Sequence, residues 1–172
     1  FLCRNAPESK DGKSVYAFFP GCQLGASDPS LVTQSYQYLL QHEPATGIIL
    51  SCCGVPAEWG GDEEATDRAV QQIRDGWISL SKPTLVMTCP TCKKFFQTHL
   101  SEIPLVFLYD LMANWGVDGT SLNKSLTSKN IKEQIGPMSI FDPCSTYHGD
   151  SVRRSIRKIV DDLGIQTQPL PR

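Results

Sequence analysis

Five of the seven cysteines in this chain form one spacing pattern, called here the five-cysteine set. Its members are Cys22, the adjacent pair Cys52 and Cys53, which Gly54 follows, and the C-x-x-C pair Cys89 and Cys92. Cysteine thiolates are nucleophiles and good ligands for soft metals. A set of this size therefore indicates metal binding or redox chemistry.

Three kinds of chemistry could use these thiols. A structural zinc ion takes four ligands, usually from two C-x-x-C-like clips, whereas this chain offers one clip, one adjacent pair and one distant cysteine. A metal-free dithiol site would use only Cys89 and Cys92 and would leave the other three without a role. An iron–sulfur cluster contains several irons and can take all five thiolates. The pattern favours a cluster, with zinc and the dithiol as alternatives.

Each cysteine group directly follows a segment that is typical of a buried strand. The segments are 15–19 before Cys22, 46–51 before Cys52 and Cys53, and 84–88 before Cys89. A helical stretch comes after each group, so the chain repeats the order strand, cysteine, helix. Right-handed crossovers place the carboxyl ends of parallel strands at one edge of a sheet, where ligands bind. We therefore expect the five-cysteine set to converge at that edge.

The alternation of strands and helices predicts an α/β fold. We expect three layers around a mainly parallel sheet, with Rossmann-like strand–Cys–helix units. Helix starts are indicated by Asp28 with Pro29, by Asp62, and by Pro90. A further strand is expected at 105–108, and a further helix at 110–115. Helix N-termini favour thiolates, so lowered thiol pKa values are expected at the cysteines that precede or open helices, which are Cys52, Cys53, Cys89 and Cys92.

Beyond this first unit, the chain has the features of the beginning of another. The expected organisation is a lead-in at 1–14, a first α/β unit at 15–117, a surface excursion at 118–138, and a strand and helix at 139–172 that start a second unit. In this last part, 139–142 is predicted to be a strand that adds to the sheet edge, with self-association as the second outcome. A helix is predicted from 150 to 163. The start at Phe1 suggests a piece of a longer protein.

Composition and charge exclude several classes of function. The 172 residues, 40% hydrophobic and 20% charged, suit a globular domain with its own core. A formal net charge of −2 gives no electrostatic reason to expect binding to nucleic acid or to an anionic membrane. No apolar run approaches the roughly 20 residues of a membrane span, and no secretory signal is visible. We expect a cytoplasmic, reducing location, where cysteines serve metal or redox chemistry.

The remaining candidates have ordinary structural interpretations as well as functional ones. Cys144 could be a further ligand at the same edge, a ligand of a second half, or a bystander, and Cys3 is expected to be incidental. Lone helical histidines usually lie on the surface or in the core, which is the expectation for His99 and His148. Trp59 could keep water from the site or could simply pack. A solvated helix face is expected for the basic cluster of Arg153, Arg154, Arg157 and Lys158.

The motifs together resemble the cysteine-rich CCG domain. The resemblance is carried by Phe-Pro-Gly-Cys22, by Cys52-Cys53-Gly54 and by the Cys89 and Cys92 pair, and it covers residues 15 to about 96. The family includes the cysteine-rich subunit of heterodisulfide reductase and related iron–sulfur subunits of glycolate, lactate and glycerol-3-phosphate oxidoreductases. Members usually carry two such motifs, and Asp142-Pro143-Cys144 resembles the start of the second.

The resemblance implies a cofactor, ligands and a function. It implies a [4Fe-4S] cluster, which is non-cubane in heterodisulfide reductase, held by Cys22, Cys52, Cys53, Cys89 and Cys92. Other members keep the scaffold with a different cluster or with zinc. The chain is accordingly expected to be a domain of an oxidoreductase that passes electrons to a thiol or disulfide substrate, or to a partner flavoprotein or ferredoxin-like subunit.

Overall fold

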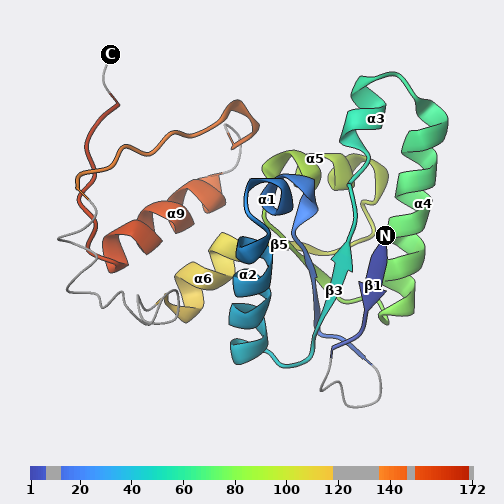
Figure 1. Cartoon of the computed structure of the whole chain (residues 1–172), viewed down its shortest axis with the longest axis horizontal. Coiled ribbons are helices and arrows are strands. Elements are labelled where there is room, and N and C mark those ends of the chain that lie inside the picture. The colour runs from blue at the N-terminus through green and yellow to red at the C-terminus, as the bar shows by residue number, and fades with distance from the viewer. Residues whose placement is uncertain (7–12, 118–135, 147–149, 171–172) are drawn as a thin grey trace. The chain divides into compact units, whose positions relative to one another are not determined.

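The computed structural model describes residues 1–6, 13–117, 136–146 and 150–170 (Figure 1). These fall into two compact units, Phe1–Val106 and Phe107–Arg172. Within the described part of the chain, no helix combines the length and apolar character of a membrane span. The predicted surface excursion lies almost wholly outside the described residues, and the predicted domain boundaries stay a prediction.

A five-stranded, mixed but mostly parallel sheet forms the centre of the fold (Figure 1). Its order is β1-β3-β2-β4-β5, with bounds Leu2–Arg4 (β1), Tyr16–Phe19 (β2), Thr46–Leu50 (β3), Thr84–Met87 (β4) and Leu105–Phe107 (β5). β2 pairs in parallel with β3 and with β4, so that Phe18 lies opposite both Ile48 and Val86. β1 pairs with β3 in antiparallel orientation. The predicted α/β fold with a mainly parallel sheet is confirmed.

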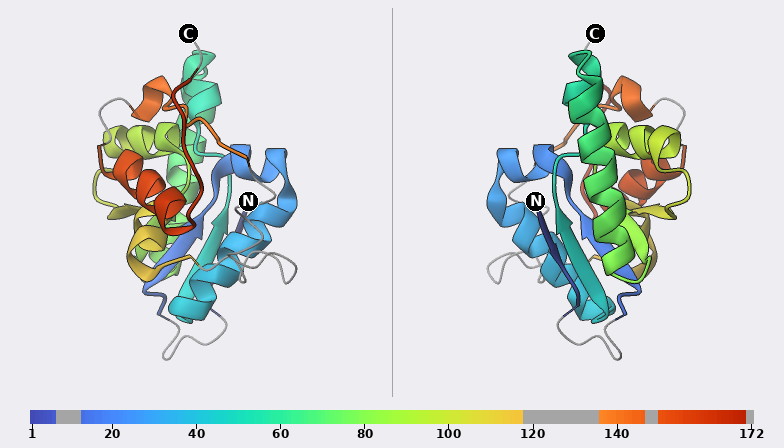
Figure 2. Two further views of the ribbon diagram at one scale, coloured as in Figure 1. Left: turned by 90° about the vertical axis from the view of Figure 1, so that its left-hand side faces the viewer. Right: turned by 90° about the vertical axis from the view of Figure 1, so that its right-hand side faces the viewer.

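Helices cover both faces of the sheet in the first unit. Their bounds are Gly21–Ser27 (α1), Pro29–His42 (α2), Val55–Trp59 (α3), Glu63–Ser79 (α4) and Pro90–His99 (α5). α2 and α4 lie on opposite faces (Figures 1 and 2) because the chain crosses the sheet in opposite directions from β2 to β3 and from β3 to β4. The carboxyl end of β2 is therefore a topological switch point, the position where α/β folds bind ligands.

Local sequence explains where two of these helices begin. The side chain of Asp28 accepts a hydrogen bond from the N–H of Ser30, and the side chain of Asp62 accepts one from the N–H of Ala65. Each contact satisfies a backbone donor that has no partner inside its helix. Both predicted helix starts are confirmed.

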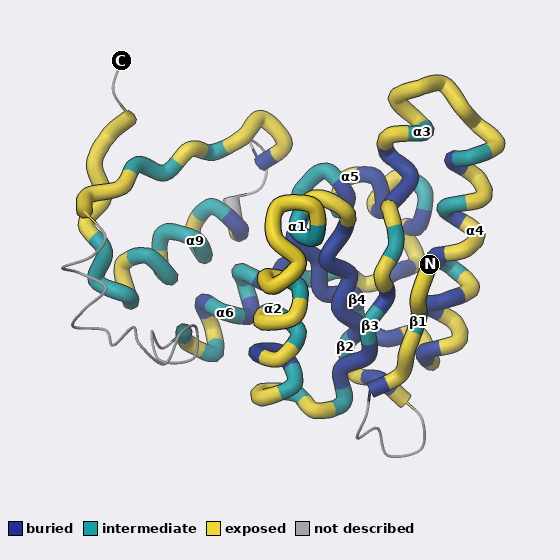
Figure 3. Tube along the Cα trace, in the orientation of Figure 1, coloured by how far each residue is buried: buried dark blue, intermediate teal, exposed yellow. Residues whose placement is uncertain are grey.

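The central strands are buried on both faces (Figure 3). Residues 17–19 of β2 and 85–87 of β4 are at most 1% exposed. This burial is typical of parallel strands that lie between two layers of helices. Phe19 packs against Phe96 of α5 with 5.1 Å between ring centroids. The apolar core thus reaches the end of β2, where the cysteine-bearing loops begin.

Three short elements were not predicted. The lead-in contains β1, which hydrogen-bonds to β3 along its whole length. α1 begins at Gly21, directly after β2, and α3 occupies five residues after Gly54. The predicted strand at 105–108 ends at Phe107, and the next helix, α6, spans Leu108–Trp115 instead of starting at 110.

The second unit contains α6, the 3-10 helix η2 (Cys144–Thr146) and α9 (Asp150–Asp162). α9 agrees with the helix predicted from 150 to 163. α6 and α9 pack together, and the hydroxyl of Ser155 donates a hydrogen bond of 2.6 Å to Asp110 Oδ1.

The predicted strand at 139–142 is wrong, and so is its addition to the sheet. Met138 instead forms an isolated parallel bridge with Thr167, and the sheet contains none of residues 139–142. Pro137 and Pro143 flank the segment and have no N–H to donate to a ladder, which shortens any strand that could form. Phe141 consequently stays 70% exposed.

Candidate functional site

The three cysteine groups follow three adjacent strands of the sheet. Cys22 lies in the first turn of α1 after β2, and Cys52 and Cys53 lie between β3 and α3. Cys89 follows β4 as the N-cap of α5, and Cys92 lies in the first turn of that helix. Because β3, β2 and β4 are neighbours, these groups meet at the carboxyl edge of the sheet.

Cys92 is at the centre of the thiol contacts. Its thiol is hydrogen-bonded with those of Cys53 and Cys89, and its single S–H proton can be donated to only one of the two sulfur atoms at a time. A Cβ atom on Gly21 would lie 3.4 Å from Cys92 Sγ, so the backbone that precedes Cys22 runs near this thiol. The φ angle of +70° at Gly21 lies in the left-handed region, which favours glycine at this close approach.

Cys22 joins the group from the other side. Its thiol is hydrogen-bonded to that of Cys52 and also feels the charge of Cys53. The pKa of Cys22 is raised first by partial desolvation of its thiol, although the residue as a whole is exposed, and next by the charge of Cys52. The structure therefore links Cys22 with Cys52, and Cys92 with Cys53 and Cys89, and the two groups are near enough for the charge of Cys53 to act on Cys22.

The hydrogen bonds divide these thiols by acidity. Cys89 has a pKa lowered from 9.0 to about 5, chiefly because of its hydrogen bond with the Cys92 thiol. Burial acts in the opposite direction and would raise this pKa, whereas the backbone N–H groups of Cys92 and Thr91 lower it further. The hydrogen bond from Cys92 also lowers the pKa of Cys53 to about 7, and the Val55 N–H assists. Hydrogen bonding with Cys53, and then with Cys89, raises the pKa of Cys92 itself. The expected lowering holds for Cys53 and Cys89 and is wrong for Cys92.

One side of the site is open. Cys53 and Cys92 are 2% and 3% exposed, whereas Cys22 and Cys52 are exposed. All seven cysteines are free thiols. A molecule could approach the set from the side of Cys22 and Cys52.

The donor atoms of the set are all sulfur, and two of the thiols have lowered pKa values. Such donors fit soft metals and iron–sulfur clusters. Across the described ranges, no three Cys, His, Asp or Glu side chains surround one position suited to a single metal ion.

Thr88 is a positioning residue that the sequence did not indicate. Its hydroxyl donates a hydrogen bond of 2.6 Å to the carbonyl oxygen of Pro20, and Thr88 is 7% exposed. This contact ties the loop before Cys89 to the loop before Cys22. Because it joins residues 68 apart in the chain, no local pattern could reveal it.

The weaker candidates have separate surroundings. Cys3 lies on β1, and its thiol donates to the carbonyl oxygen of Gly76 in α4 at 3.5 Å. Cys144 is an exposed residue of η2 in the second unit. Trp59 is 75% exposed, so packing does not explain it. His148 lies outside the described residues.

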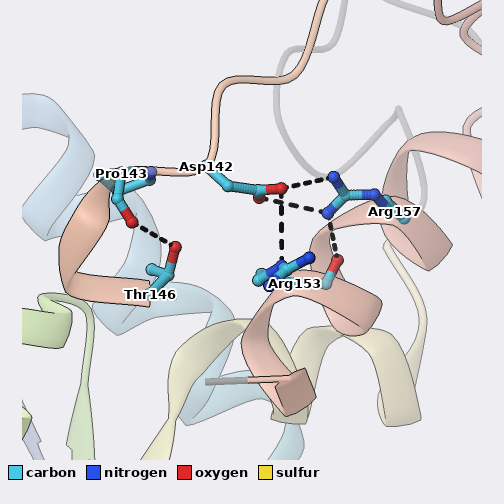
Figure 4. Close-up of polar contacts among 5 residues, drawn as sticks. All are labelled: Asp142, Pro143, Thr146, Arg153 and Arg157. Carbon is cyan, nitrogen blue, oxygen red and sulfur yellow. Dashed lines mark hydrogen bonds and ion pairs between the residues drawn. The ribbon is translucent and has the colours of Figure 1, made fainter. Parts of the chain in front are cut away.

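Two members of the basic cluster bind one carboxylate (Figure 4). Arg157 donates to both oxygens of Asp142, at 3.2 and 2.6 Å, and Arg153 Nε lies 3.5 Å from Asp142 Oδ2. The hydrogen bonds from Arg157 lower the pKa of Asp142. Arg154 is exposed and Lys158 pairs with Asp162, as a solvated face predicts. Arg153 and Arg157 instead fix the turn that carries Cys144 to α9.

Comparison with known proteins gives one match. Residues 16–97 match the model of the CCG family, described as a cysteine-rich domain, and this range runs from β2 to α5 and includes the whole five-cysteine set. No curated protein and no solved structure matches the chain. CCG domains are typical of the iron–sulfur subunits of heterodisulfide reductase-like oxidoreductases and generally bind iron–sulfur clusters. The resemblance noted from the motifs is thus confirmed, and residues 16–97 of this chain are a cysteine-rich CCG domain.

Proposed function

We propose that this CCG domain holds an iron–sulfur cluster and serves in electron transfer within a heterodisulfide reductase-like oxidoreductase. The observation that carries the proposal is that thiols from three adjacent strands interact, Cys22 with Cys52 and, through charge, with Cys53, and Cys92 with Cys53 and Cys89. The proposed ligands are Cys22, Cys52, Cys53, Cys89 and Cys92, and the proposed cluster is of the [4Fe-4S] type. When bound, such a cluster would supply one-electron transfer.

The residues of the chain would contribute in different ways. Cys89, with a pKa of about 5, is a thiolate at neutral pH and is ready to bind metal. The buried Cys53 and Cys92 would keep water from one side of the bound group. The exposed Cys22 and Cys52 leave the other side accessible to a substrate or partner.

We further propose a disulfide or thiol substrate, or a flavoprotein or ferredoxin-like partner, in a reducing cytoplasm. Reduction of a disulfide to two thiols consumes two electrons and two protons, so a partner subunit must supply the electrons. Free thiols at all seven cysteines are consistent with a reducing location.

Reconstitution tests the proposal. Anaerobic incubation of the full chain with ferrous iron and sulfide should give brown protein in which iron and sulfide are present in equal amounts. Cys53→Ser and Cys89→Ser should abolish this uptake, and Cys3→Ser, whose thiol contacts α4 instead, is the matched control. Equal iron loss in Cys3→Ser, or uptake of zinc alone, would refute the proposed ligand set.

A second candidate is the metal-free dithiol oxidoreductase. The pKa of about 5 at Cys89, lowered by its hydrogen bond from Cys92, is what a C-x-x-C nucleophile requires. This function predicts that metal-free protein reduces a disulfide and that Cys22→Ser leaves the rate unchanged. The cluster proposal predicts that metal-free protein is inactive and that Cys22→Ser impairs the loaded protein.

A further inference from the structure

Glu58 and His99 connect the helix that follows Cys-Cys-Gly to the far end of the C-x-x-C helix. His99 Nε2 lies 2.8 Å from Glu58 Oε1, and the imidazole ring packs on Phe95 with 4.3 Å between ring centroids. Glu58 belongs to α3 and His99 is the last residue of α5. The two side chains are 43% and 29% exposed, so they are partly accessible to water.

This pair is one of three contacts along a single face of α5. Cys92, Phe95 and His99 are spaced i, i+3 and i+7, which puts them on the same side of the helix. The contacts are Cys92 with Cys53, Phe95 with Gly54, and His99 with Glu58. A thiol is a weak hydrogen-bond donor, and the Phe95 contact is apolar. The Glu58–His99 pair is therefore the strongest directional contact of the three.

His99 itself is too far away to be a ligand. Seven residues of helix place it about 10 Å along the axis from Cys92, and its Nε2 atom is engaged by Glu58. It can influence the cysteines only through the two helices that it joins.

We propose that Glu58 and His99 are positioning residues that fix α3 to α5 and thereby hold Cys53 against Cys92. This inference rests on the proposed function where a cluster is concerned, but the thiol contact that the pair controls exists in the metal-free protein. Cys53 and Cys92, which come from distant parts of the chain, would then keep the same separation with and without a bound cluster.

Alkylation of the metal-free full chain, followed at each cysteine by mass spectrometry, tests the proposal. Cys53 and Cys92 are almost fully buried, so their labelling requires local opening. Glu58→Ala and His99→Ala should each raise the alkylation rate at both thiols roughly two- to fivefold, the range expected for one lost surface pair. The rate at the exposed Cys144 should not change, and the double variant should match either single variant.

The chain offers a matched control and a conservative variant. Glu102 is 44% exposed and its Oε1 lies 2.8 Å from Arg74 Nε, so Glu102→Ala removes a comparable ion pair by the same truncation as Glu58→Ala. It should leave the labelling of Cys53 and Cys92 unchanged. Glu58→Gln keeps an oxygen that can accept a hydrogen bond from His99, and it should restore most of the protection.

Several results would overturn the inference. These are unchanged labelling in Glu58→Ala, the same increase in Glu102→Ala, or a larger drop in melting temperature in Glu58→Ala than in that control. In iron-loaded protein, a shifted electron paramagnetic resonance spectrum in Glu58→Ala, with an unshifted one in Glu102→Ala, would support it. Failure of the unaltered chain to bind iron would refute the proposed function, and the alkylation rates would still decide the role of the pair.

Discussion

Gly54 should be hard to replace, because it combines a left-handed backbone with close neighbours in two helices. Its φ of +106° lies in the left-handed region, and a Cβ atom there would lie 3.1 Å from Phe95 Cζ and 3.2 Å from Ala69 Cβ. Both neighbours belong to helices packed on this side of the unit, α5 and α4. Gly54→Ala should therefore cause both backbone strain and a steric clash.

The expected magnitude follows from these two costs. A left-handed conformation costs an L-residue about 1–2 kcal/mol, and overpacking of a core typically costs about 1–3 kcal/mol. Alanine also lowers the conformational entropy of the unfolded chain, which stabilises the folded state and offsets up to about 1 kcal/mol of these costs. We expect the free energy of unfolding to fall by about 2–4 kcal/mol, which corresponds to a drop of roughly 5–15 °C in melting temperature for a chain of this size.

Urea denaturation followed by circular dichroism measures this change, and Gly61→Ala is the control. Gly61 has a φ of +74°, but a Cβ atom there would have no neighbour within 4 Å. It should show the backbone cost less the same gain from the restricted unfolded chain, a net loss of up to about 2 kcal/mol. Equal losses in the two variants would refute the clash with Phe95 and Ala69, and no loss in either would refute the argument from backbone strain.

Three further predictions concern single side chains. Thr88→Val removes a buried hydrogen bond to Pro20 and should lower the free energy of unfolding by about 1–3 kcal/mol in the same denaturation assay. Cys89 has a pKa lowered from 9.0 to about 5, so its thiolate stabilises the folded state fully above pH 9, and this stabilisation is lost as the pH falls through 5. The urea midpoint of the unaltered protein should therefore rise between pH 5 and pH 9, and that of Cys89→Ser should rise less steeply. Asp142→Asn should weaken the attachment of the η2 turn to α9 and increase amide hydrogen exchange in α9.

Much of the fold could be predicted because it depends on local signals. Aspartates that cap α2 and α4, and apolar runs that are buried in β2, β3 and β4, are visible in the sequence. The convergence of the five-cysteine set followed from these strands, since parallel strands share a carboxyl edge. β1 and α3 are too short to show a periodic pattern. The segment 139–142 has the composition of a strand, but strand formation also needs a partner, and two flanking prolines limit the pairing.

The site was predicted less completely than the fold for a related physical reason. Helix position alone suggested lowered pKa values at Cys53, Cys89 and Cys92 alike, because all lie at or before helix starts. In the structure hydrogen bonding among the thiols decides the outcome: it lowers the pKa values of Cys53 and Cys89 and raises that of Cys92, which lies between them. The Thr88–Pro20 and Glu58–His99 contacts likewise join residues far apart in the chain. Sequence spacing thus indicates which thiols meet, whereas tertiary contacts determine how far apart they are held and which of them ionise.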